Sequence, residues 1–377
     1  MFSLWPFNNT DRNMELTNNN ERSMILFRLF LISLFSIAVL MSVPLANSVA
    51  GQEAAQEWSP NRVDSHAPIG VMGDHKHEKG EVMFSYRLMT MRMEGSRDGT
   101  TSLKDSDITS ATGAYKYMMT PTEMDMEMHM FGIMVGLSDN ITLMGMLPAV
   151  RNSMSVVNRM GMGFNTSSGG FGDAKIGAMI GLAENSIHHG QSLHLNAMLS
   201  IPNGSITEKN VLPTSNGMPM QLPYPMQIGS GTFDLLPAIT WLGQFGAISW
   251  GTQANATIRL GTNERNWALG NRYSVTGWLA RILHPSFSAA LRLNASTVGD
   301  IKGRDGMLNA MMTPAARTDL RSGETVEGGF SLNFYLPKLK AFRIALEGLY
   351  PLYRNLDGPQ LETDWTFMIG LQIVPIK

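Results

Sequence analysis

The chain has 377 residues, and its 29 basic residues against 31 acidic ones give a formal charge of -2. This near-balance argues against a nucleic-acid-binding protein, and an apolar content of 44% argues against a disordered chain. Cysteine is absent, which excludes disulfide scaffolds, thiolate metal sites and cysteine nucleophiles. The 30 methionines are unusually many, and their placement is the most informative feature of the sequence.

The first 50 residues have the pattern of a secretory signal peptide. An apolar run over residues 29–43 follows Arg22 and Arg28, and the small residues Ser48-Val49-Ala50 follow the run. The alternative is an uncleaved anchor, but the run is shorter than the roughly 20 residues of a spanning helix. We therefore predict a signal peptide over residues 1–50, which cleavage removes from a chain outside the cytoplasm. A solvated periplasmic segment over residues 51–80 is expected to follow.

From residue 81 onward, apolar and polar residues alternate with a period of two, which is typical of half-buried β-strands. The predicted strands are 81–93, 122–137, 141–154, 172–183, 191–201, 231–242, 246–260, 270–283, 286–298, 325–336, 341–350 and 361–374. Short turns and long loops alternate between them. This arrangement predicts an all-β fold, a transmembrane up-and-down antiparallel β-barrel of about twelve strands over residues 81–377.

The alternative is a soluble sandwich or lipocalin-like barrel, which turns its apolar face inward. The even strand count, the asymmetry of the loops and the charges on the polar faces favour the membrane barrel. The expected location is the outer membrane of a Gram-negative bacterium, after signal-peptide cleavage. The expected partners are the lipid bilayer and a small-molecule solute, and no nucleic acid.

Glycine and proline motifs in the middle of the chain carry a family resemblance. They are Phe171-Gly172-Asp173-Ala174-Lys175, Ile201-Pro202-Asn203-Gly204, and Gly229-Ser230-Gly231-Thr232 followed by Leu235-Leu236-Pro237. These pieces resemble outer-membrane transporter-like barrels of the meta-pathway phenol-degradation type, over about residues 68–374. The resemblance implies a barrel with a transport role, no agreed substrate and no catalytic residues.

The methionines share one face of several predicted strands. In segment 81–93 they occupy odd positions beside Ser85 and Arg87, whereas the even positions are apolar. In segment 122–137 they occupy even positions, opposite an apolar odd face. Since the apolar face meets lipid in such a barrel, we expect the methionines to face the lumen. The candidate lumen residues are Met89, Met91, Met93, Met124, Met126, Met128, Met130, Met144, Met146 and His194.

Three roles remain open for a lumen lined by methionine. The side chains fill space, form an adaptable apolar passage, or bind Cu(I), for which thioethers are selective. We expect passive uptake or export of small apolar or aromatic compounds, with soft-metal (copper) binding or transport as the alternative. No cofactor is expected, copper aside. The candidate metal ligands are Met89, Met91, Met126, Met128, Met144, His75 and His77.

Other features carry weaker signals. His75 and His77 lie within Asp74-His75-Lys76-His77-Glu78, which suits a divalent metal, although a solvated lead-in to the first strand is the plainer interpretation. The proline-rich segment 222–226 is expected to fold over the barrel mouth. No nucleophile motif, phosphate loop or zinc signature appears in the sequence, so we do not expect an enzyme.

Overall fold

The computed structural model describes residues 59, 62–184, 190–213, 215–336 and 339–374. The predicted signal peptide lies outside these residues. Within the described part of the chain, no helix is long and apolar enough to cross a membrane.

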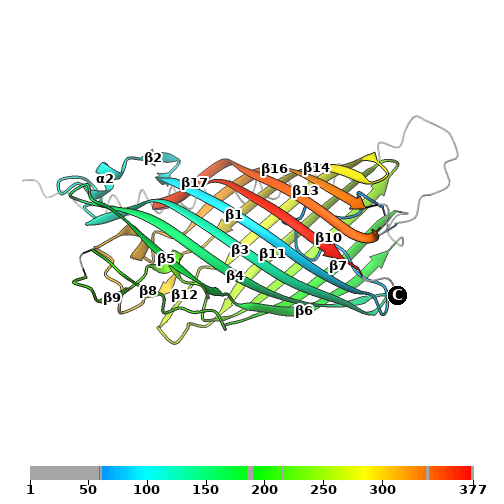
Figure 1. The fold of residues 1–377 in the computed structure, drawn as a ribbon, viewed down its shortest axis with the longest axis horizontal. Helices are drawn as coiled ribbons and strands as arrows, with labels where there is room; N and C mark the ends of the chain where they lie inside the picture. Colours follow the sequence, from blue (N-terminus) through cyan, green and yellow to red (C-terminus); the bar gives the residue numbers. More distant parts are fainter. Residues whose placement is uncertain (1–58, 60–61, 185–189, 214, 337–338, 375–377) are drawn as a thin grey trace, which may run out of the picture. The chain divides into compact units, whose positions relative to one another are not determined.

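Antiparallel strands form a closed barrel (Figure 1), in which each strand pairs with its neighbours along the chain and the last pairs with the first. The barrel strands are β1 (Val82–Gly99), β3 (Met119–Ser138), β4 (Ile141–Asn158), β6 (Ala174–Glu184), β7 (Gln191–Ile201), β10 (Phe233–Phe245), β11 (Ile248–Leu260), β13 (Arg272–His284), β14 (Phe287–Val298), β16 (Gly323–Leu336) and β17 (Leu339–Ile373). Up-and-down connectivity of this kind follows directly from the alternation of turns and loops along the sequence.

The long strand β17 crosses the barrel twice. Leu356 faces Gly323 at the start of β16 and also Gly99 at the end of β1. Residues before Leu356 pair with β16 and those after it pair with β1, both antiparallel, so the chain reverses close to Asp357. The eleven labelled strands therefore make twelve crossings, which confirms the predicted barrel of about twelve strands.

Short elements occupy the long loops at one end of the barrel, while the short turns lie at the other end (Figure 1). Most barrel strands begin or end within a few residues of the predicted bounds, and several extend further toward the long loops. The additional elements are β2 (Thr101–Leu103), α2 (Asp105–Thr109), β5 (Gly163–Phe171), β8 (Lys209–Val211), β9 (Pro219–Gln221), η1 (Tyr224–Met226), β12 (Trp267–Ala268), β15 (Lys302–Gly303) and η2 (Pro314–Ala316).

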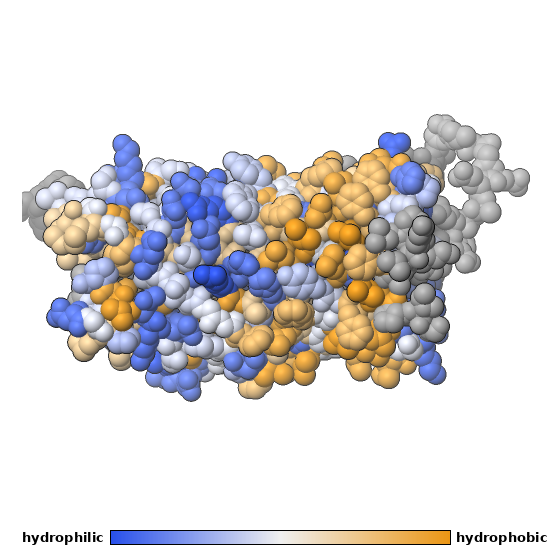
Figure 2. All heavy atoms as spheres, in the orientation of Figure 1, coloured by the Kyte–Doolittle hydropathy of each residue, from blue (hydrophilic) through white to orange (hydrophobic). Residues whose placement is uncertain are grey.

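The barrel wall is apolar outside and polar inside. Phe84, Phe131 and Leu291 are 51%, 51% and 65% exposed, whereas His194 and Asn333 are fully buried. A soluble barrel would have the opposite arrangement, so that alternative is wrong. Figure 2 shows hydrophobic residues gathered on the half of the wall toward the short turns, as a lipid-facing band requires.

The other half of the wall in Figure 2 is hydrophilic. Here the guanidinium of Arg92 on β1 contacts the carboxylates of Glu123 and Asp125 on β3, at 2.9 and 2.8 Å. These side chains point outward, as the strand parity predicted, and they lie in the part of each strand that leads to the long loops. Their placement keeps charge off the apolar band, where it would be costly.

The topology makes a labelling prediction. Single cysteines at Ser106, Asn216 and Gly306, all exposed in the long loops, are expected to react with an impermeant maleimide on intact cells. A cysteine at Asn140, in the turn between β3 and β4, is expected to react only after lysis. The cysteine-free sequence makes each label unambiguous. Labelling of Asn140 alone on intact cells would invert the orientation.

Candidate functional site

The segment before β1 lies inside the barrel, and we call residues 62–80 the plug. Ala67, Ile69 and Val71 are 1%, 1% and 2% exposed, and Asp74 is 3% exposed. The prediction that Asp74-His75-Lys76-His77-Glu78 is a solvated lead-in is therefore wrong for Asp74, His75 and His77, all of which are buried. The apolar stretch that precedes Asp74 was the signal of this burial, because apolar side chains are mostly buried in folded proteins.

Hydrogen bonds fix the plug to strands all around the wall. Both His194 Nε2 and Asn196 Nδ2 donate to the Gly73 carbonyl at 2.9 Å, and the Gly70 amide donates to Glu347 Oε2 at 2.6 Å. Further bonds join Ser288 to Val63 O, Arg343 to Ala67 O, Gln253 to Met72 O, and the His77 amide to Thr142. These contacts satisfy the polar backbone of an irregular segment buried in the lumen.

Close packing of the plug against the wall requires glycine. Gly73 has φ of 64°, and a Cβ at this position would lie 2.5 Å from the Asn196 amide nitrogen. On the wall, a Cβ at Gly370 of β17 would lie 2.3 Å from the Ile69 side chain. Glycine is the residue that allows both the left-handed backbone and the close approach.

One side of the inner wall is charged. Arg292 on β14 and Glu347 on β17 form a buried ion pair with an N–O distance of 3.0 Å. Arg343 donates to Asn333 Oδ1 at 3.1 Å and also bonds Gln372. These groups were not among the residues predicted from the sequence. Strand parity was the available signal, because each of them alternates with apolar, outward-facing neighbours.

Methionines cover the other side of the inner wall. Across β1 and β3, Met93 faces Met124, Met91 faces Met126, and Met89 faces Met128. Met89 also faces Met368 on β17. Directly opposed residues have Cβ atoms about 4.5–5.5 Å apart, so neighbouring thioethers come into contact range. The structure therefore brings most of the predicted lumen methionines together on one surface, including Met130 and Met146, which line the cavity described below.

One member of the predicted metal set lies apart from the others. Met144 faces Met134 on β3, and it packs with Met83 and Met179 near the short turns. Met134 lies four residues beyond Met130 on β3. It lies six residues from Met128, which is about 20 Å along the strand. The expectation that Met144 shares a site with Met89, Met91, Met126 and Met128 is wrong, because register places it at another depth.

The loop segment 222–226 packs onto the barrel wall at the end that carries the long loops. Leu222 is 2% exposed and Met226 is fully buried, and both pack with Met124 and Met154 of the barrel wall. Tyr224 of η1 meets Trp267 edge to face, with ring centroids 5.0 Å apart. The apolar inner strip therefore continues into the outer loops.

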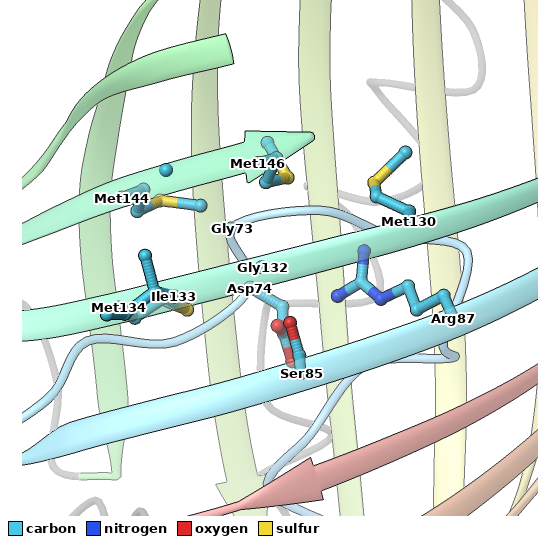
Figure 3. A pocket seen from close by; sticks show the side chains of 11 residues that line it. Gly73, Asp74, Ser85, Arg87, Met130, Gly132, Ile133, Met134, Met144 and Met146 are labelled. Atoms are coloured by element: carbon cyan, nitrogen blue, oxygen red, sulfur yellow. The ribbon is translucent and has the colours of Figure 1, made fainter. Parts of the chain in front are cut away.

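A small cavity lies between the plug and the methionine side of the wall. Figure 3 shows Asp74 of the plug, Arg87 of β1, and Met130 and Met134 of β3 around a small cavity. Its volume is about 10 Å³, enough for about one water molecule. The plug and the wall are closely packed around this cavity.

Each predicted histidine candidate contacts or belongs to the plug. His194 is fully buried on β7 and holds the Gly73 carbonyl, so it positions the plug. His75 Nδ1 donates to the Asp74 carboxylate at 2.9 Å, and His77 Nδ1 lies 3.4 Å from Glu81. The sequence analysis missed His66, whose ring meets that of His75 with centroids 4.1 Å apart.

The family-like motifs have a structural role in the outer loops. The Asp173 carboxylate accepts hydrogen bonds from the Gly204 amide at 2.9 Å and from the Ser230 amide and hydroxyl at 2.8 and 2.7 Å. It thereby joins the loop before β6, the loop after β7 and the loop before β10. The motifs therefore set loop geometry, with Asp173 as the acceptor and glycine where the loops approach closely.

No family model and no curated protein matches this chain. Among solved structures, it is similar to the COG4313 outer membrane channel from Pseudomonas putida F1, with a TM-score of 0.54 and 12% identity over 81% of this chain and 99% of that one. The TodX monoaromatic hydrocarbon channel matches with a TM-score of 0.39 and 9% identity, over 79% of this chain and 90% of that one. A Pseudomonas aeruginosa FadL homologue matches with a TM-score of 0.35 and 10% identity, over 78% and 89% of the two chains. The first of these similarities shows the fold, a closed antiparallel barrel that outer-membrane channels adopt.

Proposed function

We propose that this protein is an outer-membrane channel that passes small apolar or aromatic compounds along its methionine-lined inner wall. The observation that carries the proposal is the continuity of that wall. Methionines cluster near the short turns, line the middle of β1 and β3, and meet the outer loops at the mouth. Thioethers are flexible and polarizable, and they adapt to ligands of different shape.

Two further observations support this function. The apolar outer band and the polar interior fit a barrel in lipid, and the fold resembles that of an outer-membrane channel. The plug packs against the wall around a cavity of about 10 Å³, and we infer that a solute passes only when the plug is displaced or rearranged. Passage is therefore gated by the chain's own N-terminal segment.

Copper is the second candidate, and the cross-strand pairs favour it. Met89 faces Met128, and Met91 faces Met126, so four thioethers lie on two adjacent strands. Soft thioether ligands select Cu(I). Binding there would make the same wall a soft-metal surface instead of an apolar passage.

Substitution of these four methionines distinguishes the two functions. Leucine at Met89, Met91, Met126 and Met128 keeps the apolar volume but removes the sulfur donors, so Cu(I) stoichiometry falls sharply only if copper is the ligand. Aspartate at Met91 and Met128 places charge in the path, and it is expected to slow uptake of an aromatic probe about tenfold. Copper binding to purified barrel and probe uptake by cells are measured for both sets.

Leucine at Met144 is the matched control, because this methionine lies outside the paired group. It is expected to leave both copper binding and uptake unchanged. If neither the leucine nor the aspartate set changes either measurement, the methionines merely fill the lumen, and both proposed functions are refuted.

A further inference from the structure

Three side chains that carry metal-ligating atoms converge inside the plug. His66, Asp74 and His75 each offer one such atom, and the three atoms lie within 4.8 Å of one another. His66 Nδ1 is 3.6 Å from Asp74 Oδ2, and His75 Nδ1 is 2.9 Å from Asp74 Oδ1. The turn at Pro68, closed by a hydrogen bond from the Val71 amide, returns the chain so that these residues meet.

The histidine cluster leaves buried nitrogen atoms without partners. His75 and His77 are 7% and 5% exposed, and the Nε2 atom of each makes no hydrogen bond within the described residues. His66 Nδ1 is also buried without a hydrogen bond, and the side chain of His66 is 13% exposed. Most buried polar side-chain atoms have a hydrogen-bond partner, so the unpartnered Nε2 atom of His75, within the cluster, is consistent with a missing ligand.

The cluster combines two imidazoles with one carboxylate. Burial, together with the nearby His75 and Arg343, lowers the pKa of His66 well below its usual value, so the imidazole is neutral at pH 7. Burial opposes ionisation of Asp74, but the imidazoles of His75 and His66 outweigh it and hold the pKa of that carboxyl well below its usual range.

We propose that His66, Asp74 and His75 bind a divalent transition-metal ion of the zinc or copper(II) class within the plug. Two imidazoles and one carboxylate match the ligand preferences of these ions. Magnesium and calcium prefer oxygen ligands alone, and Cu(I) prefers thioethers, so neither class fits as well. The site does not rest on the proposed transport function.

A bound ion at this place stabilises the folded plug. It joins His66 to Asp74 and His75, and so fixes both ends of the loop formed by residues 67–73. That loop carries Gly70 and Gly73, which hold the plug on Glu347, His194 and Asn196 of the wall. The metal and the wall therefore stabilise the same conformation.

Calorimetric titration of the purified, folded full-length barrel with Zn²⁺ tests the proposal. The protein carries no histidine tag, and His188 and His189 are replaced by alanine because adjacent histidines bind the same ions. The expected result is one Zn²⁺ per chain in the parent, with the dissociation constant raised about tenfold or more by His66→Ala, His75→Ala or Asp74→Asn. Titration with Mg²⁺ is expected to show no binding.

Matched variants control for histidine content and for the methionine wall. His129→Ala removes an exposed histidine on the outer face, and Met89→Leu with Met128→Leu removes thioethers. Both are expected to leave Zn²⁺ affinity unchanged. Parent-like affinity in His66→Ala and His75→Ala, or no binding by the folded parent, would overturn the proposal whatever the transport assays show.

A spectroscopic measurement covers variants that fold poorly. In the parent, the electron paramagnetic resonance spectrum of bound Cu²⁺ is expected to show coupling to two imidazole nitrogens. The conservative variant His75→Gln is expected to show coupling to one. A spectrum that does not change between them would place the ion elsewhere and refute the assignment.

Discussion

Deletion of residues 63–77 is expected to convert the barrel into an open pore, with a single-channel conductance about tenfold or more above that of the intact chain. The intact lumen leaves a cavity of only about 10 Å³ beside Asp74. Removal of the plug exposes the charged inner wall around Arg292 and Glu347 to water. Conductance in planar bilayers measures the effect, and an unchanged value would mean that another segment closes the lumen.

A disulfide provides the converse experiment, since it holds the plug in place. A Cβ at Gly370 would lie 3.6 Å from the Ile69 Cβ, within the range of about 3.5–4.5 Å that a disulfide needs. The chain has no other cysteine to compete. The oxidised Ile69→Cys, Gly370→Cys variant is expected to block uptake, and dithiothreitol is expected to restore it.

The matched control for the disulfide is the pair Ile69→Ser and Gly370→Ser, which has a similar shape but forms no bond. It is expected to take up solute at the same rate with and without the reductant. If the oxidised cysteine variant takes up solute as fast as the reduced one, displacement of the plug is not required for passage.

Glu347→Leu is expected to lower the free energy of unfolding by about 3–5 kcal/mol, because it leaves the Arg292 guanidinium buried without its partner. Glu347 is 1% exposed and also accepts a hydrogen bond from the Gly70 amide. The substitution therefore also removes a hydrogen bond that holds the plug to the wall. Urea unfolding in lipid vesicles, followed by tryptophan fluorescence, measures the change. An effect below about 1 kcal/mol would mean that water reaches Arg292.

The double variant Glu347→Leu, Arg292→Met separates the charge from the packing. It removes both ions and keeps similar volume, so most of the lost stability is expected to return. If the double variant is as unstable as Glu347→Leu alone, the loss comes from the plug anchor and not from an unpaired charge.

Local pattern determined the barrel itself. The period of two located all twelve crossings, most of them within a few residues, and the double crossing of β17 corresponds to the two segments 341–350 and 361–374. It also predicted the inner face, because side chains of a strand alternate strictly between its two faces. That is why the methionines of β1 and β3 were placed on the inner wall from sequence alone.

Register decided which methionines meet, and no local pattern contains register. Met89 and Met128 are neighbours, whereas Met144 lies at another depth, although all three side chains share the inner face. The choice depends on how β1, β3 and β4 slide past one another, which the turn geometry and the closure of the barrel set together. The pattern of a single strand predicts which face a side chain occupies, but it does not predict the depth of that side chain within the barrel.

The sequence by itself thus determined the strand count, the connectivity and the polarity of the two faces, because these arise from contacts between neighbours in the chain. Only the tertiary structure decided that residues 62–80 enter the lumen, since that depends on wall groups such as His194 and Glu347, more than 100 positions away. By contrast, the local turn at Pro68 brings His66 beside Asp74. An irregular segment has no periodicity of its own, so its place is fixed by the partners that satisfy its buried backbone.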